Sequence, residues 1–425
     1  MEYTLLRSCF SFPKFSFALR TTNTSNHHQI LEEYDRAVRE AMEGILGSPL
    51  ASWQWQQATL PTAMGGLGLR SASSHGAAAY LASVTAAGMI VQEIQQAGQE
   101  GRGFDEQLEV RDDVDHLQPP ASVALSLADL NAQLGDPLNY GEVTAHTQRS
   151  LSAMIDTESS NLLLQSLGDE DERELARLKC VAREGAGDWL TAYPSKSLGL
   201  HLRRMEFVTA ARYRLGLPVF QVEAECPMPR CVRVSDMMGD HAISCGIGGE
   251  RIARHNHVRD ALFHTAVQAG LGPVREPDGL LPGSDDRPAD VLIPVWSSGK
   301  DTALDFTVVN PLQGALVSAA SEDGSSAVEH AHNLKLRKYE ERCAGEGITF
   351  LPMAVDTLGG WHPEALAIIQ RLGRQLARNV GKLDEEVVRH LRQRLGVLLV
   401  RDNVAMLCAR TPTFPPAEVD GEDDF

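Results

Sequence analysis

Three cysteines and a histidine near the middle of the chain have the clearest potential chemistry: Cys226, Cys231, His241 and Cys245. Four, nine and three residues separate them, so each pair can come from one short turn. Structural zinc sites bind the ion tetrahedrally through four such side chains. The pattern predicts a CCHC zinc knuckle that is structural, because four protein ligands leave no position open for a catalytic water. His255 and His257, in a predicted helix, remain alternatives for the fourth ligand.

Two aspartates follow the knuckle, each within a short β-rich run. Asp290 lies in the run 287–293 and Asp305 in the run 302–309. Carboxylates on adjacent strands can hold Mg²⁺ through oxygen ligands, and the ion then lowers the pKa of a bound water and offsets charge on a phosphate. Glu276, on the preceding predicted strand, is a third candidate. We therefore predict a catalytic magnesium site, with simple capping of strand ends as the alternative for both aspartates.

A lysine usually completes such a site by stabilising the developing negative charge. In the standard arrangement it lies two residues after the second acid, where this chain has Thr307. A predicted helix over 327–343 offers Lys335 and Lys338 instead. We prefer Lys335 as the lysine of this site. Lys338 is the alternative, because it stands directly before Tyr339 and a lysine–tyrosine pair is also a signature of such sites.

The block from 226 to 339 resembles the carboxy-terminal region of non-long-terminal-repeat retrotransposon proteins of the restriction-like endonuclease class. These proteins carry a CCHC knuckle and then a PD-(D/E)xK-type nuclease whose lysine has moved to a following helix. Segments before the knuckle, such as Arg-Leu-Gly-Leu-Pro at 214–218, resemble the thumb and linker that follow a reverse transcriptase palm. The chain has no Tyr/Phe-x-Asp-Asp palm motif, so we expect no polymerase activity. Ala289 separates Pro288 from Asp290, which the family more often has adjacent.

The resemblance implies an α/β fold: a restriction-endonuclease-like mixed sheet flanked by helices, with a zinc knuckle and an α-helical N-terminal region. The predicted domains are a thumb-like helical segment (1–90), an acidic linker and helical region (91–185), a helical linker with the knuckle (186–250), the nuclease (251–410) and an acidic disordered tail (411–425). Periodic apolar residues predict helices over 30–46, 74–87, 161–183, 203–215, 251–269, 327–343, 363–378 and 385–409, and a further strand over 347–355. Weak periodicity between 97 and 136 predicts a linker there.

The net charge of −18 is unusual for a protein that handles nucleic acid. Residues 91–176, however, contain eighteen acidic and only four basic side chains, and the tail contains five more acids. The remainder of the chain is near neutral, so the charge does not exclude phosphate binding by the nuclease part. Seven cysteines, an odd number, favour metal binding in a reducing compartment over disulfides.

The resemblance implies an intracellular, nuclear, Mg²⁺-dependent endonuclease that nicks target DNA. DNA is the expected partner, with element RNA and a separate reverse transcriptase chain as further candidates, and no run of eighteen apolar residues predicts a membrane span. The alternative is a catalytically inactive relic of a mobile element that binds zinc and nucleic acid without cutting it.

Overall fold

The computed structural model describes residues 1–100, 121–168 and 171–410. The chain forms two compact units: unit 1 comprises Met1–Pro61 and Leu67–Ser166, and unit 2 comprises Thr62–Gly66 and Leu167–Phe425. The part of the predicted linker at 101–120 and the predicted tail at 411–425 lie outside the described residues.

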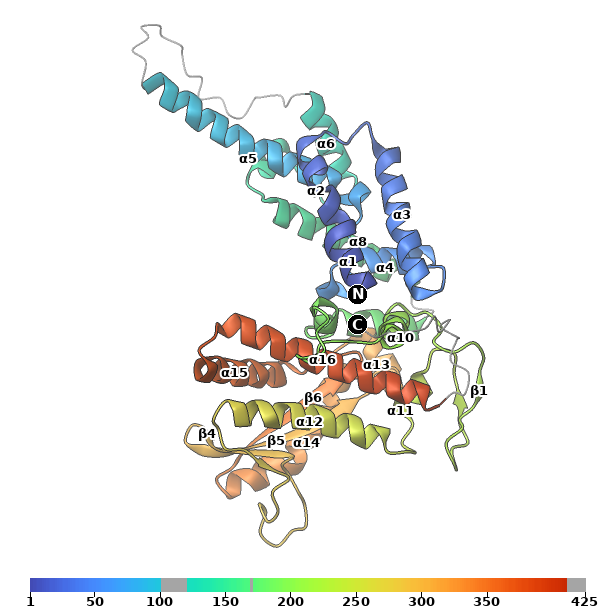
Figure 1. The fold of residues 1–425 in the computed structure, drawn as a ribbon, viewed down its shortest axis with the longest axis vertical. Helices are drawn as coiled ribbons and strands as arrows, with labels where there is room; N and C mark the ends of the chain where they lie inside the picture. Colours follow the sequence, from blue (N-terminus) through green and yellow to red (C-terminus); the bar gives the residue numbers. More distant parts are fainter. Residues whose placement is uncertain (101–120, 169–170, 411–425) are drawn as a thin grey trace. The chain divides into compact units, whose positions relative to one another are not determined.

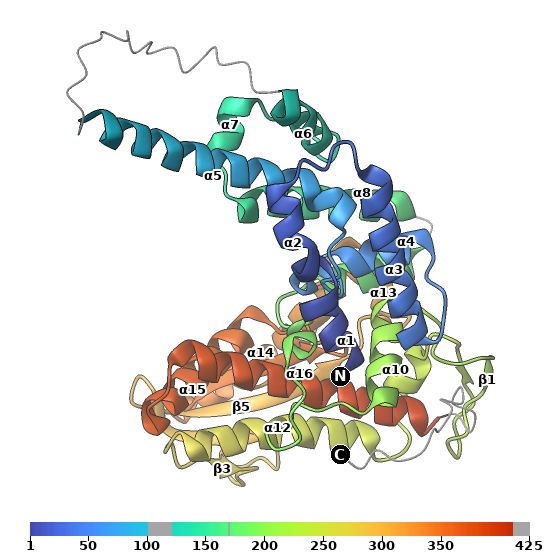
Figure 2. The ribbon, with the colours of Figure 1, turned by 45° about the horizontal axis from the view of Figure 1, so that its top comes forward.

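Unit 1 is built from helices throughout its described residues. They are α1 (Glu2–Leu5), a π-helical turn (Leu6–Phe10), α2 (Phe12–Thr21), α3 (His28–Leu46), α4 (Ser52–Thr59), α5 (Ala72–Glu100), α6 (Ala121–Asn131), α7 (Tyr140–Thr144) and α8 (Gln148–Leu167). Helix α2 packs on α5 (Figure 2). Helix α5 is longer than predicted and crosses the expected boundary at residue 90, and α6 lies in the stretch predicted to be a linker.

An aspartate of α3 holds the beginning of α5. Asp35 accepts hydrogen bonds from the backbone N–H groups of Ala72 (2.7 Å) and Ser73 (3.1 Å) and from the Ser71 hydroxyl (2.6 Å). The first N–H groups of a helix have no partner within the helix, and a carboxylate satisfies them well. A side chain distant in sequence therefore caps α5.

Unit 2 contains the strands and the helices that pack on them. Its described elements are short 3₁₀ turns (Thr62–Met64 and Asp188–Thr191), α9 (Glu172–Val181), α10 (Arg204–Arg214), β1 (Ala224–Glu225), β2 (Val234–Ser235), α11 (Asp240–Ser244), α12 (Glu250–Gln268), β3 (Val274–Arg275), β4 (Val291–Ser297), β5 (Lys300–Val309), α13 (Val317–Glu322), α14 (Ser326–Gly345), β6 (Thr349–Asp356), α15 (Pro363–Val380) and α16 (Asp384–Cys408) (Figure 1). The larger sheet has the order β3-β4-β5-β6. Only β5 and β6 are parallel, and α13 and α14 connect them. The predicted mixed α/β class is confirmed.

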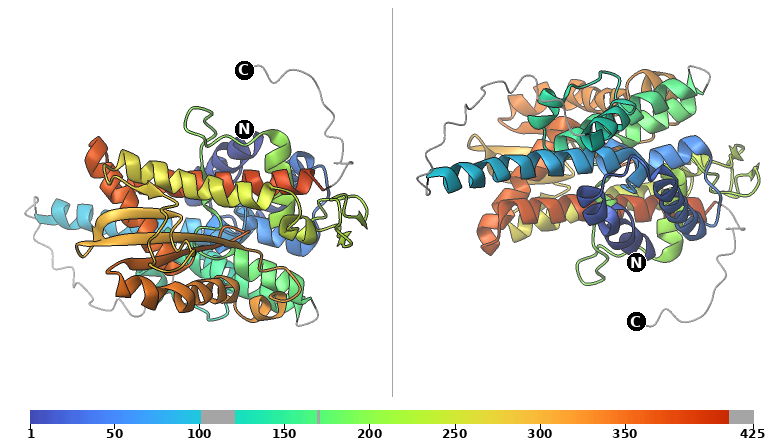
Figure 3. Two further views of the ribbon diagram at one scale, coloured as in Figure 1. Left: turned by 90° about the horizontal axis from the view of Figure 1, so that it is seen from below. Right: turned by 90° about the horizontal axis from the view of Figure 1, so that it is seen from above.

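Helices cover both faces of this sheet (Figure 3). One face packs on α12, α15 and α16 through a core that includes Val291, Phe306 and Ile369. The other face packs on α14 through Ala303, Tyr339 and their neighbours. Alternation of side chains along β5 assigns Leu304 and Phe306 to the first face and Ala303 and Asp305 to the second. Asp305 therefore lies on the face that α14 covers.

The helix predicted over 161–183 is in fact two helices. Helix α8 ends at Leu167 before Gly168, whose φ of +60° is a conformation that favours glycine. Helix α9 then begins after Asp171, whose carboxylate accepts the Glu174 N–H at 3.0 Å as an N-cap. The apolar residues keep a helical spacing across this break. The sequence pattern therefore did not reveal that one helix stops before Gly168 and the next starts after Asp171, only three residues later.

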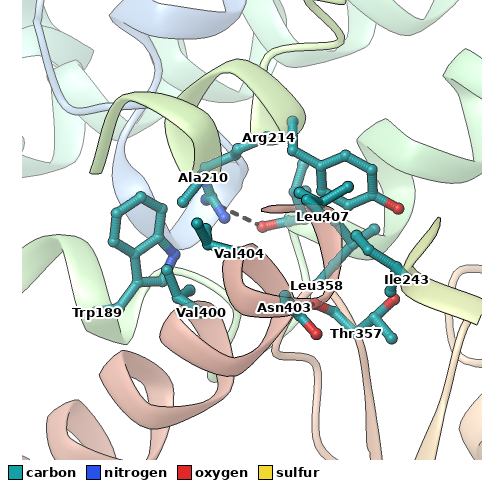
Figure 4. Close-up of a pocket in the computed structure, with 12 residues that line it drawn as sticks. Trp189, Ala210, Arg214, Ile243, Thr357, Leu358, Val400, Asn403, Val404 and Leu407 are labelled. Carbon is teal, nitrogen blue, oxygen red and sulfur yellow. Dashed lines mark hydrogen bonds between the residues drawn. The ribbon is translucent and has the colours of Figure 1, made fainter. Parts of the chain in front are cut away.

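The segment before the knuckle packs directly on α16 of unit 2. Helices α10 and α16 enclose a small apolar pocket lined by Trp189, Ile243 and Leu407 among others (Figure 4). Arg214 lies at its edge and is 3% exposed. Its guanidinium donates to the carbonyls of Ala186 (2.8 Å) and Thr62 (2.9 Å), so the charge is satisfied by backbone. Arg214, part of the family-like stretch, thus has a packing role.

Membrane insertion has no support in the described helices: none of them combines the length and the apolar character that a span requires.

Candidate metal centres and active site

The four predicted zinc ligands lie together at the small β1–β2 ribbon. Cys226 follows β1, Cys231 lies in the turn before β2, His241 is in α11, and Cys245 ends that helix. The turn is tight, because the Cys231 N–H donates to the Met228 carbonyl at 3.0 Å and the Cys226 N–H to the Arg233 carbonyl at 2.9 Å. Both predicted pairs therefore come from short turns.

The spacing of the ligand atoms fits a zinc ion. A tetrahedron with zinc–ligand bonds of 2.0–2.3 Å places its corners roughly 3.4–3.8 Å apart. Cys226 Sγ is 4.0 Å from Cys245 Sγ, and Cys231 Sγ is 3.4 Å from His241 Nε2. All four ligand atoms lie within 4.8 Å of one another. Burial lowers the pKa of His241, as does the charge of Arg233, which favours the neutral imidazole that binds metal.

Side chains around the knuckle fix it to unit 2. The Asp236 carboxylate accepts the N–H groups of Asp240 (3.1 Å) and His241 (2.8 Å), which caps α11. Arg410, 1% exposed, donates to the carbonyls of Cys245 (3.5 Å) and Ile247 (2.8 Å). The ligand turns are therefore held from both sides, which suits a structural metal site.

Asp290 and Asp305 lie close together where β4 begins beside β5. Strand β4 starts at Val291, which pairs with Leu304, so Asp290 directly precedes β4 and Asp305 directly follows the paired Leu304. The Asp290 N–H donates to the Leu304 carbonyl at 2.9 Å, so Asp290 and Val291 both lie against Leu304 and the regular register ends there. The two carboxylates interact, since the charge of Asp290 and a hydrogen bond with it both raise the pKa of Asp305.

Both carboxylate oxygens of Asp290 have partners. Its Oδ1 lies 3.1 Å from His255 Nε2, and its Oδ2 accepts the Phe306 N–H at 2.6 Å. Burial by itself would raise the pKa of Asp290, but the hydrogen bond and charge of His255, the Phe306 N–H and Lys335 together hold it below its usual value. Asp290 is therefore ionised at neutral pH.

Asp305 is buried beside the only lysine that reaches it among the described residues. Lys335 Nζ lies 2.8 Å from Asp305 Oδ2. The contact is an ion pair largely shielded from water, since the Asp305 side chain is 7% exposed. Burial raises the pKa of Asp305 to about 6, and the negative charge of Asp290 adds to the effect while Lys335 opposes it.

This arrangement fits a divalent cation. Two neighbouring carboxylates, one of them buried, provide the hard oxygen ligands that Mg²⁺ prefers. A cation near Asp305 would also relieve the unfavourable burial that raises its pKa.

Two predicted site residues lie elsewhere. Lys338 is 3.4 Å from Asp286 Oδ1 and lies over the Tyr339 ring, so it does not reach Asp305. The Glu276 N–H donates to the Asp290 carbonyl at 2.9 Å, but its carboxylate pairs with Arg259. Of the predicted catalytic residues, the structure brings Asp290, Asp305 and Lys335 together.

An open groove of about 340 Å³ extends from Ile243 and Ser244 of α11 to Lys335. Its walls come from α11, the start of α12, the end of β5, the loop before α13, and α14. Arg251, His330 and Lys335 contribute basic side chains to the lining, and Asn310 and Gln313 contribute amides. Such donors bind phosphate oxygens in nucleic-acid complexes.

The two histidines considered as substitute zinc ligands point away from the knuckle. His255 contacts Asp290, and His257 Nδ1 lies 2.8 Å from Asp402 Oδ1. The role of His255 was missed from sequence. The available signal was the spacing of Arg251, His255 and Arg259 at i, i+4 and i+8 in the predicted helix before Asp290, which places three basic residues on one face.

A second histidine cluster was also missed, and its geometry favours a structural role. His332 and His362 stack with ring centroids 3.7 Å apart and 13° between the planes, beside Glu329 and Glu364. Since imidazole lone pairs lie in the ring plane, two parallel stacked rings do not direct both nitrogens at one ion. His362 Nδ1 also accepts the Glu364 N–H at 3.3 Å as the N-cap of α15. We interpret the cluster as a contact that joins α14 to the start of α15.

No protein-family model matches this chain, and no curated protein sequence matches it.

Proposed function

We propose that this protein is a Mg²⁺-dependent DNA endonuclease of the non-long-terminal-repeat retrotransposon class, with a restriction-like nuclease fold. One observation carries the proposal: the carboxylates of Asp290 and Asp305 interact beside the start of β4, with Lys335 Nζ 2.8 Å from Asp305. Two acids and a lysine gathered at the inner strands of a mixed sheet are what phosphodiester hydrolysis with a divalent cation requires.

Each residue would have a distinct role. Asp290 and Asp305 would hold the magnesium ion, which when bound makes water a better nucleophile and offsets phosphate charge. Lys335, 32% exposed, can turn from Asp305 toward a phosphate oxygen and stabilise its negative charge. Arg251 and His330 would bind the DNA backbone along the groove.

The knuckle would carry zinc as a structural ion. Its four ligands close the coordination sphere, and its helix α11 forms one wall of the groove. Cys226, Cys231, His241 and Cys245 would thus shape the DNA-binding surface without taking part in the reaction.

Nicking of chromosomal DNA would place the protein in the nucleus. Element RNA and a separate reverse transcriptase chain are further partners that the resemblance suggests. The second candidate function, a relic that binds nucleic acid without cleaving it, is favoured by the net charge of −18, which repels DNA unless the groove overcomes it.

The decisive experiment is nicking of supercoiled plasmid by the zinc-loaded full chain with Mg²⁺ or Mn²⁺, beside the Asp305→Ala variant. Metal-dependent nicking that the substitution abolishes would support the nuclease. Absence of nicking by folded wild type, together with retained DNA binding in a gel-shift assay, would favour the relic.

The two lysines should separate in the same assay. We expect Lys335→Ala to reduce nicking about 10²-fold, because removing one group that stabilises developing charge typically has an effect of this size. Lys338→Ala should stay close to wild type, because Lys338 contacts Asp286 on the surface. Equal losses in both variants, or a loss in Lys338→Ala alone, would contradict the assignment of Lys335.

A further inference from the structure

Helix α12, which packs on one face of the sheet, carries a row of basic side chains. Arg251, His255 and Arg259 recur every four residues, so they lie along one side of the helix. Arg251 lines the groove, His255 contacts Asp290, and Arg259 pairs with Glu276. The helix is held firmly, because Val258, Leu262 and neighbours pack into the main core.

The hydrogen bond from His255 helps to fix the orientation of the Asp290 carboxylate. His255 Nε2 lies 3.1 Å from Asp290 Oδ1, and the Phe306 N–H lies 2.6 Å from Oδ2. With a donor on each oxygen, the carboxylate plane of Asp290 is fixed by one side chain and one backbone group. The remaining lone pairs of the two oxygens are then left for a cation shared with Asp305, whose carboxylate interacts with that of Asp290.

We propose that His255 is a positioning residue of the nuclease site, which orients the Asp290 carboxylate for the divalent cation. The inference rests on the proposed function and adds a residue that the motif of two acids and a lysine does not contain. Ligating carboxylates are commonly held by such outer partners, and loss of the partner typically weakens metal binding 10- to 100-fold. His255 performs this role by donating a hydrogen bond through Nε2 to Asp290 Oδ1.

The same helix supplies a matched comparison. His257 also pairs with an aspartate, since its Nδ1 lies 2.8 Å from Asp402 Oδ1. Asp402, however, belongs to α16 and is not one of the two proposed cation ligands. Removing His257 therefore deletes a histidine–aspartate pair of similar length without touching Asp290.

The test is binding of Mn²⁺, which accepts the same oxygen ligands as Mg²⁺, to the zinc-loaded full chain without DNA. Free Mn²⁺ is measured by electron paramagnetic resonance. His255→Ala should raise the Mn²⁺ dissociation constant by about 10- to 100-fold. His255→Gln places an amide N–H near the position of Nε2 and should recover most of the affinity, and His257→Ala should match wild type.

Wild-type affinity in His255→Ala would overturn the positioning role and leave the proposed nuclease intact. So would a loss in His255→Gln as large as in His255→Ala, with unchanged far- and near-ultraviolet circular dichroism, because the donor would then not be what matters. Failure of the wild type itself to bind Mn²⁺ would instead overturn the proposed nuclease site, and the role of His255 with it.

Discussion

Replacing Asp305 by asparagine is expected to reduce Mg²⁺-dependent nicking about 10³-fold while raising the stability of the magnesium-free protein. The loss of activity follows from the removal of a cation ligand, since a metal ion contributes several kcal/mol to the transition state and each 1.36 kcal/mol changes the rate tenfold. The gain in stability follows from the cost of burying the Asp305 carboxylate, to which the negative charge of Asp290 adds.

The sign of the pH dependence follows from the raised pKa. The folded protein holds the proton of Asp305 up to about pH 6, whereas the ordinary value is 3.8. Between these two values the folded state binds more protons than the unfolded state, so the free energy of unfolding falls as pH rises. A shift of this size corresponds to about 3 kcal/mol above pH 6. The cost vanishes below about pH 4, so the stability advantage of Asp305→Asn should appear only as pH increases through this window.

Urea denaturation of both proteins from pH 4 to pH 7.5, in zinc-containing buffer without Mg²⁺, measures this difference. Asp286→Asn is the matched control, because hydrogen bonds from Arg342 and Lys338 lower the pKa of exposed Asp286, and its loss should slightly reduce stability near neutral pH. An Asp305→Asn protein that is less stable than wild type at pH 7.5 would show that the Lys335 ion pair outweighs the repulsion. Retained nicking would remove Asp305 from the site.

Replacing Cys245 by serine is expected to release the zinc and to destabilise unit 2 by several kcal/mol. Structural zinc contributes about 10–16 kcal/mol of apparent binding energy in isolated zinc-finger peptides, and without it the ligand turns have little to hold them. One of those turns contains Arg230 at φ +71°, a conformation uncommon outside glycine. The effect should reach the rest of unit 2, because Arg410 binds the carbonyl of Cys245.

Zinc per chain by elemental analysis and the midpoint of guanidinium denaturation measure the two effects. Cys9→Ser is the control, since Cys9 is an exposed thiol of unit 1 and should leave one zinc ion per chain and an unchanged midpoint. A Cys245→Ser protein that still carries stoichiometric zinc would show that the four ligands have been assigned incorrectly.

Local signals in the sequence were sufficient for the ligand turns and for most helices of unit 2. The cluster of three cysteines and a histidine could be predicted because its members lie within twenty residues and need only short turns. The β-rich runs around Asp290 and Asp305 likewise revealed two strands. The close approach of the two carboxylates could not be predicted, because it depends on the register of β4 with β5, which is set by packing and by the turn at Ser297–Lys300.

The sequence could not show which side chains of α12 and α14 reach the two aspartates. Lys335 and Lys338 are three residues apart on one helix, and only the packing of α14 on β5 and β6 determines which of them faces Asp305. Similarly, His255 resembled a spare zinc ligand by position in the chain, and only tertiary structure places it at Asp290. In unit 1, α5 continues through Gly88 to Glu100, past the predicted end at residue 87, although glycine weakens a helix.

Lys335 lies on α14, between the parallel strands β5 and β6. This placement affects which insertions and deletions the acid–lysine pair can tolerate during evolution. When acid and lysine share a strand two residues apart, one inserted or deleted residue between them reverses the side chain and destroys the pair. Here the acid and the lysine belong to different elements, and the loop at 310–316 between them can vary in length as long as α14 still packs on β6. The pair is linked through the folded core and not through a fixed interval in the gene. Drift in loop length is therefore tolerated, while substitutions at Ala331 or Tyr339, where α14 meets the sheet, can abolish the pair without altering either residue.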